Sequence, residues 1–287
     1  MKKLIAILCT VLLVLASVSG NAAGNAKYDA LAVGTTDMLT GNFFSEAFGA
    51  NSSDLDVQTL IHGYNLVRWN SGDGAYVFDD SVVSGVTVEE DAEGNRRYII
   101  ALADDLKYSN GKKINAYDYA FSVLLSISPI LEEIGGFVLH AGFIQGYEEY
   151  ANGTSKTLSG LRILSDDVLS LTVSAAYRPF FYETGLLNIL PRPASVIAPG
   201  CMVADDGNGV YLKGQQMTAE MLRKTLTDPK KGYMIRPEIT CGPYVLADYD
   251  GTTVTLKLNK YYKGNYLGNV PSIPTLTYTC DTNDGLQ

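Results

Sequence analysis

Residues 240–265 constrain the fold more than any other part of the sequence, because they combine a sharp corner, a hairpin and an aromatic exit. The corner is Cys241-Gly242-Pro243, where a glycine stands beside a proline. Residues 244–249 and 253–258 follow, and the second segment alternates apolar and polar side chains with the period of a half-buried strand. Asp250-Gly251 between them predicts a type I′ turn of two residues. The stretch therefore predicts two antiparallel strands entered through a corner.

A second informative stretch covers residues 102–126. A strand is predicted up to Leu102, and Ser109-Asn110-Gly111 predicts a turn. Asn115 then begins a helix as its N-cap, and Asp118 stands where a capping box needs a carboxylate. The helix buries a stripe that includes Phe121 and Leu124. Further hairpins are predicted over residues 82–102 and 160–173.

The order of these parts resembles family 5 of the bacterial extracellular solute-binding proteins. That family includes the oligopeptide-, dipeptide- and nickel-binding proteins of ABC importers. The resemblance lies in Gly242-Pro243-Tyr244 with the polar hairpin and Asn259 after it, and in the turn and Ala116-Tyr117-Asp118 helix opening upstream. Two departures are Asn110, where the family usually has Asp, and Lys260, where it usually has Pro.

The resemblance implies a mixed α/β fold (α+β), namely one lobe of the type II periplasmic-binding-protein kind with a smaller inserted α+β domain. We expect residues 24–70 to form the first part of lobe I, residues 71–185 an inserted domain II, and residues 186–287 the rest of lobe I, ending near the hinge to an absent lobe. Residues 30–36 are predicted to be a central strand of lobe I. The resemblance reaches across only the first half of a complete binding protein, so the chain is expected to be a fragment or a truncated reading frame.

The amino terminus has the three parts of a secretory signal. Lys2 and Lys3 precede an apolar run over residues 4–16, and small residues lead to a cleavage site near residue 23. Residues 1–23 are therefore predicted to be a signal peptide, and the protein to be exported to the periplasm or cell surface. Cys9 lies inside the apolar run, so no lipobox cysteine is recognised.

Charge and histidine content argue against several classes of function. The net charge is −9 and the basic residues are scattered, which disfavours nucleic acid as a partner. The two histidines, His62 and His140, stand in no metal-ligand pattern, and no nucleophile elbow or phosphate-binding loop is present. We therefore expect that the protein is not an enzyme and binds no cofactor.

The resemblance implies the substrate-binding component of an ABC importer, a monomer that captures peptides and delivers them to permease subunits in the membrane. An oligopeptide is the favoured ligand, while a dipeptide, a nickel complex and a modified sugar stay open. The alternative class is a secreted adhesion module that binds carbohydrate or protein through its tyrosines. The resemblance places the ligand at the loop after the first strand and at the corner before the hairpin, that is, at Thr40, Gly41, Asn42, Phe43, Phe44, Thr240, Cys241 and Gly242. A purely structural role of Phe43 and Phe44 in the core is equally open.

Three cysteines follow the predicted signal peptide, namely Cys201, Cys241 and Cys280. An odd number allows at most one intramolecular disulfide. Cys201 with Cys241 is the preferred pair, because both flank turn-rich segments of the same predicted lobe. The alternative is three reduced, buried thiols.

Overall fold

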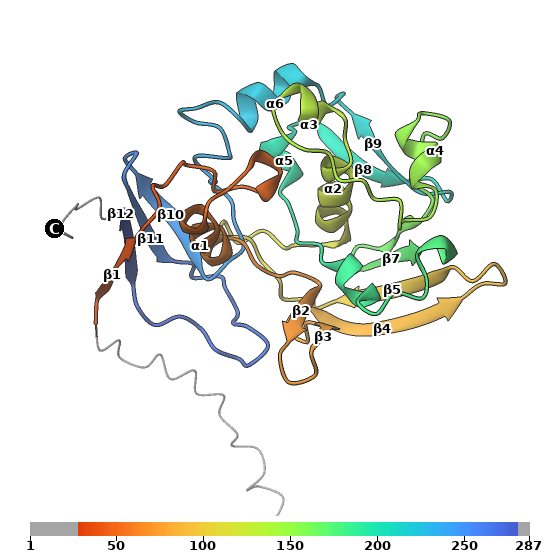
Figure 1. Cartoon of the computed structure of the whole chain (residues 1–287), viewed down its shortest axis with the longest axis horizontal. Coiled ribbons are helices and arrows are strands. Elements are labelled where there is room, and N and C mark those ends of the chain that lie inside the picture. Colours follow the sequence, from red (N-terminus) through yellow and green to blue (C-terminus); the bar gives the residue numbers. More distant parts are fainter. Residues whose placement is uncertain (1–27, 281–287) are drawn as a thin grey trace, which may run out of the picture.

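The computed structural model describes residues 28–280, so the predicted signal peptide and Cys9 lie outside the described residues. One four-stranded sheet has the order β1 (Ala30–Thr35), β12 (Thr275–Cys280), β11 (Thr253–Leu258) and β10 (Tyr244–Tyr249). β1 is parallel to β12, so the two ends of the described chain share this sheet (Figure 1). The prediction that the first strand is central is wrong, because β12 takes the interior position and leaves β1 at the edge.

The predicted hairpin β10–β11 is confirmed, but its turn differs from the prediction. A type I′ turn needs positive φ at both central residues, and of residues 250 and 251 only Gly251 has one, at 102°. The Asp250 carboxylate instead accepts hydrogen bonds from the backbone N–H groups of Thr252 and Thr253, at 2.8 and 2.7 Å. The side chain of Asp250 therefore closes the turn.

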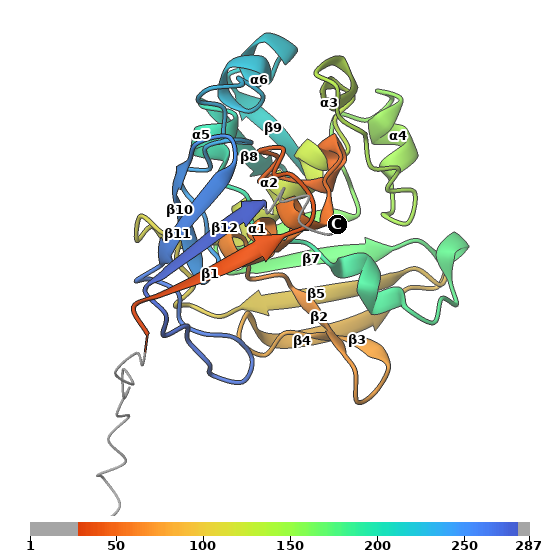
Figure 2. The same cartoon turned by 60° about the vertical axis from the view of Figure 1, so that its left-hand side comes forward.

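A second four-stranded sheet has the order β4 (Val83–Glu90), β5 (Arg96–Leu102), β7 (Val168–Val173) and β6 (Leu161–Ser165), all antiparallel. Figure 2 shows these long strands running beneath helix α2 (Ala116–Ser126). The capping box at the start of α2 is confirmed, since Asn115 Oδ1 accepts from Tyr117 N at 3.0 Å and Asp118 Oδ2 accepts from Asn115 N at 2.9 Å. Both hairpins predicted in this region are therefore present.

The other elements are short and surround these two sheets. Two hairpins are β2 (Val67–Asn70) with β3 (Ala75–Phe78), and β8 (Cys201–Asp205) with β9 (Val210–Gly214). The remaining helices are α1 (Ser52–Ile61), α3 (Ile130–Glu133), α4 (Tyr147–Ala151), α5 (Ala194–Ile197) and α6 (Ala219–Thr225), with 3₁₀ turns η1 (Glu46–Phe48), η2 (Ala175–Tyr177) and η3 (Glu183–Leu187).

Buried apolar side chains form two clusters. The smaller cluster joins the sheet of β1 and β10–β12 to α1, through residues such as Val57, Ile61 and Leu256. The larger cluster contains Leu66 and Leu222 together with Ile100 of β5. It therefore crosses both predicted domain boundaries, and the first boundary falls at the turn between β2 and β3. The division into lobe I and an inserted domain stays a prediction.

The predicted disulfide between Cys201 and Cys241 is wrong, because both thiols are free and buried. Cys201 begins strand β8, and its Sγ donates to Gln215 O at 2.9 Å. Cys241 Sγ donates to Gly63 O at 3.2 Å, beyond the end of α1. The two side chains thus hydrogen-bond to different parts of the chain.

The corner at residues 240–243 joins the two stretches that carry the family resemblance. Ser109 N donates to Thr240 O at 2.7 Å, and Thr240 N donates to Ser109 Oγ at 3.1 Å. Gly242 N donates to Ile61 O at 2.8 Å, at the last residue of α1. A Cβ atom at Gly242 would lie 2.5 Å from the carbonyl carbon of Ile61. Only glycine fits this contact without displacing the backbone of α1.

We expect Gly242→Ala to lower the free energy of unfolding by about 2–3 kcal/mol, because the added methyl overpacks against backbone atoms that cannot move aside. Urea denaturation measures the change. Gly34→Ala is the matched control, since a Cβ there meets no atom within 4 Å, and it should leave the stability within about 0.5 kcal/mol. Equal stability of the two variants would contradict the close-contact explanation.

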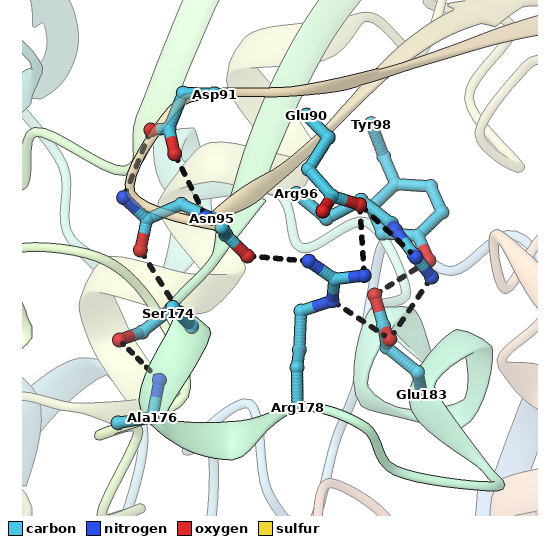
Figure 3. A network of polar contacts seen from close by, with 11 residues as sticks. Glu90, Asp91, Asn95, Arg96, Tyr98, Ser174, Ala176, Arg178 and Glu183 are labelled. Carbon is cyan, nitrogen blue, oxygen red and sulfur yellow. Dashed lines mark hydrogen bonds and ion pairs between the residues drawn. The ribbon is translucent and has the colours of Figure 1, made fainter.

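A network of charged side chains holds residues 174–187 against the β4–β5 hairpin (Figure 3). The buried Glu183 carboxylate accepts hydrogen bonds from Tyr98 OH at 2.8 Å and from Arg96 Nη1 at 3.2 Å. Arg178 Nε lies 3.4 Å from Glu183 Oε2, and Arg178 Nη2 lies 3.0 Å from Glu90 Oε2. Glu183 therefore balances two guanidinium groups at the edge of the large core.

Replacing Glu183 by Gln removes the charge that both arginines face, and we expect a loss of about 2–3 kcal/mol in the free energy of unfolding. The comparison is Glu89→Gln, whose exposed carboxylate lies 3.7 Å from Arg97 and should matter by less than about 0.5 kcal/mol. Thermal and urea unfolding of both variants give the two values. A loss at Glu183 no larger than that at Glu89 would show that the network adds no stability.

Candidate functional site

Two neighbouring cavities form one groove across the molecule. The first has a volume of about 180 Å³ and the second about 490 Å³. They share four lining residues, Phe44, Asn188, Leu190 and Arg192. We call the first the apolar compartment, for its walls of Val123, Leu125, Leu131, Leu139 and Ile189, and the second the polar compartment, for Glu46, Gln58, Thr59, His62 and Asn65.

Segments distant in the sequence meet around this groove. Residues 44–47 line it on one side, where Asn42 fixes the loop by donating from Nδ2 to Ser45 O at 2.9 Å and accepting from Phe44 N at 3.2 Å. The last turn of α1 contributes Gln58 and Thr59, the last two turns of α2 line the apolar compartment, and Pro243 of the corner reaches the polar compartment.

Arg192 is a buried cation in the wall of the groove. Its side chain is buried, with 7% of the residue exposed, yet it lines both compartments. Nη2 donates to Phe44 O at 2.6 Å, and the guanidinium lies 4.2 Å from the centre of the Phe44 ring. Within residues 28–280 no carboxylate lies at ion-pair distance from it. Burial lowers the pKa of Arg192, but a guanidinium stays charged in proteins.

His62 supports Arg192 without adding charge. Its Nε2 lies 2.8 Å from Phe43 O, so Nε2 carries the hydrogen and donates it. Arg192 Nη1 lies against the imidazole ring, 3.4 Å from Nδ1 and 3.2 Å from Nε2. Burial, and then the positive charge of Arg192, lower the pKa of His62 well below its usual value. The imidazole is therefore neutral at pH 7. Arg192 is then the one positively charged side chain lining the two compartments, and the Glu46 carboxylate, which lines the polar compartment, is not at ion-pair distance from it.

The loop after β1 contains five of the eight predicted ligand-binding residues. Phe44 lines both compartments. Phe43 is fully buried in the smaller core, where its ring meets Tyr249 edge-on at 5.0 Å. Asn42 and Gly41 are buried beneath the loop, and Thr40 is exposed with its N–H donating to Asp54 at 3.0 Å. Ligand binding by these residues stays a prediction, and the structure places Phe44 in the groove wall.

The corner contains the other three predicted residues. The side chains of Thr240 and Cys241 are buried at 1% exposure each, and Gly242 packs against α1. None of the three is among the lining residues of the two compartments, while the next residue, Pro243, is. Their role in binding also stays a prediction.

Arg192, Asn188 and His62 are not among the site residues predicted from the sequence. A signal for Arg192 was present, because it is a lone cation in the apolar, proline-flanked segment 186–198. A cation in such a segment is buried, and buried cations need a partner. The partner could not be found from the sequence, since Phe44 and His62 are more than 120 residues away from Arg192.

No cluster of three or more histidine, cysteine, aspartate or glutamate side chains within residues 28–280 is arranged to hold a metal ion. No helix in the same range combines the length and the apolar character needed to cross a bilayer.

Comparison with known protein families gives a match over most of the chain. The model of the bacterial extracellular solute-binding proteins, family 5 middle region, matches residues 81–283. A comparison with curated protein sequences gives no match.

Solved structures of similar fold include a Listeria monocytogenes OppA bound to peptide, at 16% identity and a TM-score of 0.59 over 88% of this chain. A periplasmic EDTA-binding protein, EppA, aligns at 18% identity with a TM-score of 0.60 over 90% of this chain. MppA, a periplasmic murein tripeptide-binding protein in its unliganded open form, aligns at 15% identity with a TM-score of 0.60 over 89%. At these identities the likeness shows the fold, and the chain spans 43%, 40% and 42% of these three proteins.

The lowered pKa of His62 predicts a pH dependence of stability. Because the unfolded imidazole takes up a proton below about pH 6.5 and the folded one does not, stability falls as the pH drops through that value. Between pH 7.5 and 5.5 the wild type should lose about 1.4 kcal/mol of unfolding free energy relative to His62→Gln. Urea titrations at both pH values measure this difference.

Asp118 changes the stability in the opposite direction as the pH falls. Burial raises the pKa of its carboxyl group to about 6, so protonation of Asp118 stabilises the folded state at lower pH. Both proteins contain Asp118, so its effect cancels in the comparison. The control is Gly34→Ala, which changes no ionisable group and meets no atom within 4 Å, so it should follow the wild type at both pH values. A constant difference between wild type and His62→Gln would refute the buried neutral imidazole.

Proposed function

Because the chain belongs to family 5 of the bacterial extracellular solute-binding proteins, we propose that it binds the solute of an ABC importer in the groove floored by Arg192. The family match over residues 81–283 supports a binding role rather than catalysis. The buried guanidinium without a carboxylate partner is the observation that supports this position for the ligand. A buried cation is costly unless it is paired, so a ligand carboxylate at Arg192 would supply the missing charge.

An oligopeptide is the first candidate ligand. Similar structures include OppA from Listeria monocytogenes, which was solved with bound peptide, and AppA from Bacillus subtilis, which was solved with a nonapeptide. A peptide offers two sources of carboxylate, its carboxyl terminus and an acidic side chain. Planar carboxylates also suit the fork of donors on arginine.

A small polycarboxylate is the second candidate, and two observations favour it. EppA, a similar fold with a TM-score of 0.60, is named for binding EDTA. Arg192 has no charged partner to compete with such a ligand within the described residues. The same positive floor serves either ligand.

The setting of the protein is part of the proposal. The predicted signal peptide supports export to the periplasm or cell surface, and family membership supports delivery of the ligand to membrane permease subunits by a monomeric binding protein. Similar structures are more than twice as long as the aligned chain, which supports a second lobe closing over this groove in the complete protein. Binding to the described lobe alone should then be weak.

Isothermal calorimetry with Arg192→Gln tests the proposal. The wild type should bind acidic peptides or EDTA, and the variant should bind them about 10–100-fold more weakly, because one charge-assisted contact is lost. Arg223→Gln is the matched control, since that exposed arginine also donates to a backbone carbonyl but lies outside the groove. It should bind like the wild type.

The ligand series separates the candidates. Peptides with an amidated carboxyl terminus, and peptides with Gln in place of Glu, show which carboxylate Arg192 binds. Absence of heat with peptides and EDTA for the wild type, together with binding of glycans to the exposed tyrosines, would favour the adhesion module instead.

A further inference from the structure

The apolar compartment has walls that suit a hydrocarbon group. Val123, Leu125 and Leu131 are at most 6% exposed and lie behind the cavity. Leu139 stands at the rim with 48% of its surface exposed. Its backbone N–H donates to Ser126 O at 2.8 Å, which fixes the rim to the end of α2. The compartment is thus a concave apolar surface with a fixed edge.

Several polar atoms in these walls already have partners. Ser126 Oγ donates to Ser122 O at 2.8 Å, and Ser45 Oγ accepts from Ala47 N at 3.2 Å. Asn188 Oδ1 accepts from Asn65 Nδ2 at 2.8 Å. Four described side-chain atoms are buried without a hydrogen-bond partner, and they belong to Arg68, Tyr108, Asp167 and Thr240. None of these residues lines this compartment. A polar group entering it would lose its hydration without gaining these partners.

Charge and size restrict the occupant further. Arg192 is the one charged residue among those lining the compartment, and it stands at the boundary with the polar compartment. The volume of about 180 Å³ equals that of about six water molecules at ~30 Å³ each. This is close to the number of non-hydrogen atoms in one leucine or phenylalanine side chain.

We propose that the apolar compartment is a specificity subsite for one aliphatic or aromatic side chain, on a ligand whose carboxylate contacts Arg192. This inference rests on the proposed function and adds the chemical class of the group beside the carboxylate. A bound peptide thus carries a residue of leucine to phenylalanine size next to its anionic group. A ligand with a second charge at that position is rejected, because the walls offer it no partner.

Simple carboxylic acids test the subsite without any peptide. We expect 4-methylpentanoate and 3-phenylpropanoate to bind at least 10-fold more tightly than acetate, since each buried methylene adds up to about fourfold. Two compounds of similar size are compared with 4-methylpentanoate. The first, 4-methylpentanamide, lacks the carboxylate, and the second, 5-aminopentanoate, carries a charged tail. Both should bind at least 10-fold more weakly than 4-methylpentanoate. Backbone-amide NMR titration gives the dissociation constants and should shift signals of residues 44–47, 122–126 and 188–190.

Two variants alter the compartment in different ways. Ser126→Leu fills it from the end of α2 and should weaken 4-methylpentanoate at least 10-fold while leaving acetate unchanged. Leu139→Ala removes part of the rim and should weaken 4-methylpentanoate several-fold. Leu139 is half exposed, so this variant keeps the test valid if Ser126→Leu does not fold. Ser195→Leu, at an exposed position in α5 outside both compartments, is the matched control.

The outcomes separate the subsite from the proposed function. Equal affinity for acetate and 4-methylpentanoate, or a preference that both variants leave intact, overturns the subsite even if peptides bind. Another outcome is that the protein binds 4-methylpentanoate and 3-phenylpropanoate more tightly than acetate, as expected, and yet gives no heat with peptides or EDTA. That result supports the subsite and refutes the proposed ligand classes. Shifts confined to residues outside the two compartments also overturn the subsite.

Discussion

The backbone hydrogen bonds at the corner of residues 240–243 are the constraint on which the rest of the architecture depends. They tie the end of α1, the turn before α2 and the entry to β10 into one junction. Gly242 permits this because its Cα approaches the carbonyl of Ile61 more closely than any side chain allows. The junction places Pro243 in the groove wall and fixes the last turn of α1, which bears Gln58 and Thr59 and is followed by His62 as its C-cap. The same junction therefore positions both the elements of the fold and part of the groove wall.

The electrostatics of the groove follow from that arrangement. The end of α1 brings His62 beside Arg192, and burial keeps the imidazole neutral. Phe44 adds a backbone carbonyl and a ring face, both of which suit a cation without neutralising it. Arg96 and Arg178, which are partly buried, pair with the carboxylate of Glu183. No ion pair among the described residues includes Arg192 or the partly buried Arg68, whose guanidinium lies over the Tyr266 ring. Arg192 differs from Arg68 in that it lines both compartments of the groove.

The two compartments of the groove differ in polarity. One compartment has mainly apolar walls, and the other supplies amide and hydroxyl groups and the carboxylate of Glu46. Arg192 stands where the two meet, so a ligand held by its carboxylate would have its neighbouring groups sorted by polarity. Solved structures of similar fold are more than twice as long as the aligned chain.

Local patterns in the sequence determined the family, the hairpins β4–β5, β6–β7 and β10–β11, and the capping box at Asn115, because each depends on residues a few positions apart. The predicted type I′ turn failed since the Asp250 side chain offered a competing set of hydrogen bonds. Contacts between distant segments were decided only in the tertiary structure. These contacts set the edge position of β1 and the separate surroundings of Cys201 and Cys241. They also bury Phe43 in the smaller core while the next residue, Phe44, lines the groove. Arg192 shows the reason: its charge is written in the sequence, but whether a carboxylate faces it depends on segments more than 120 residues away.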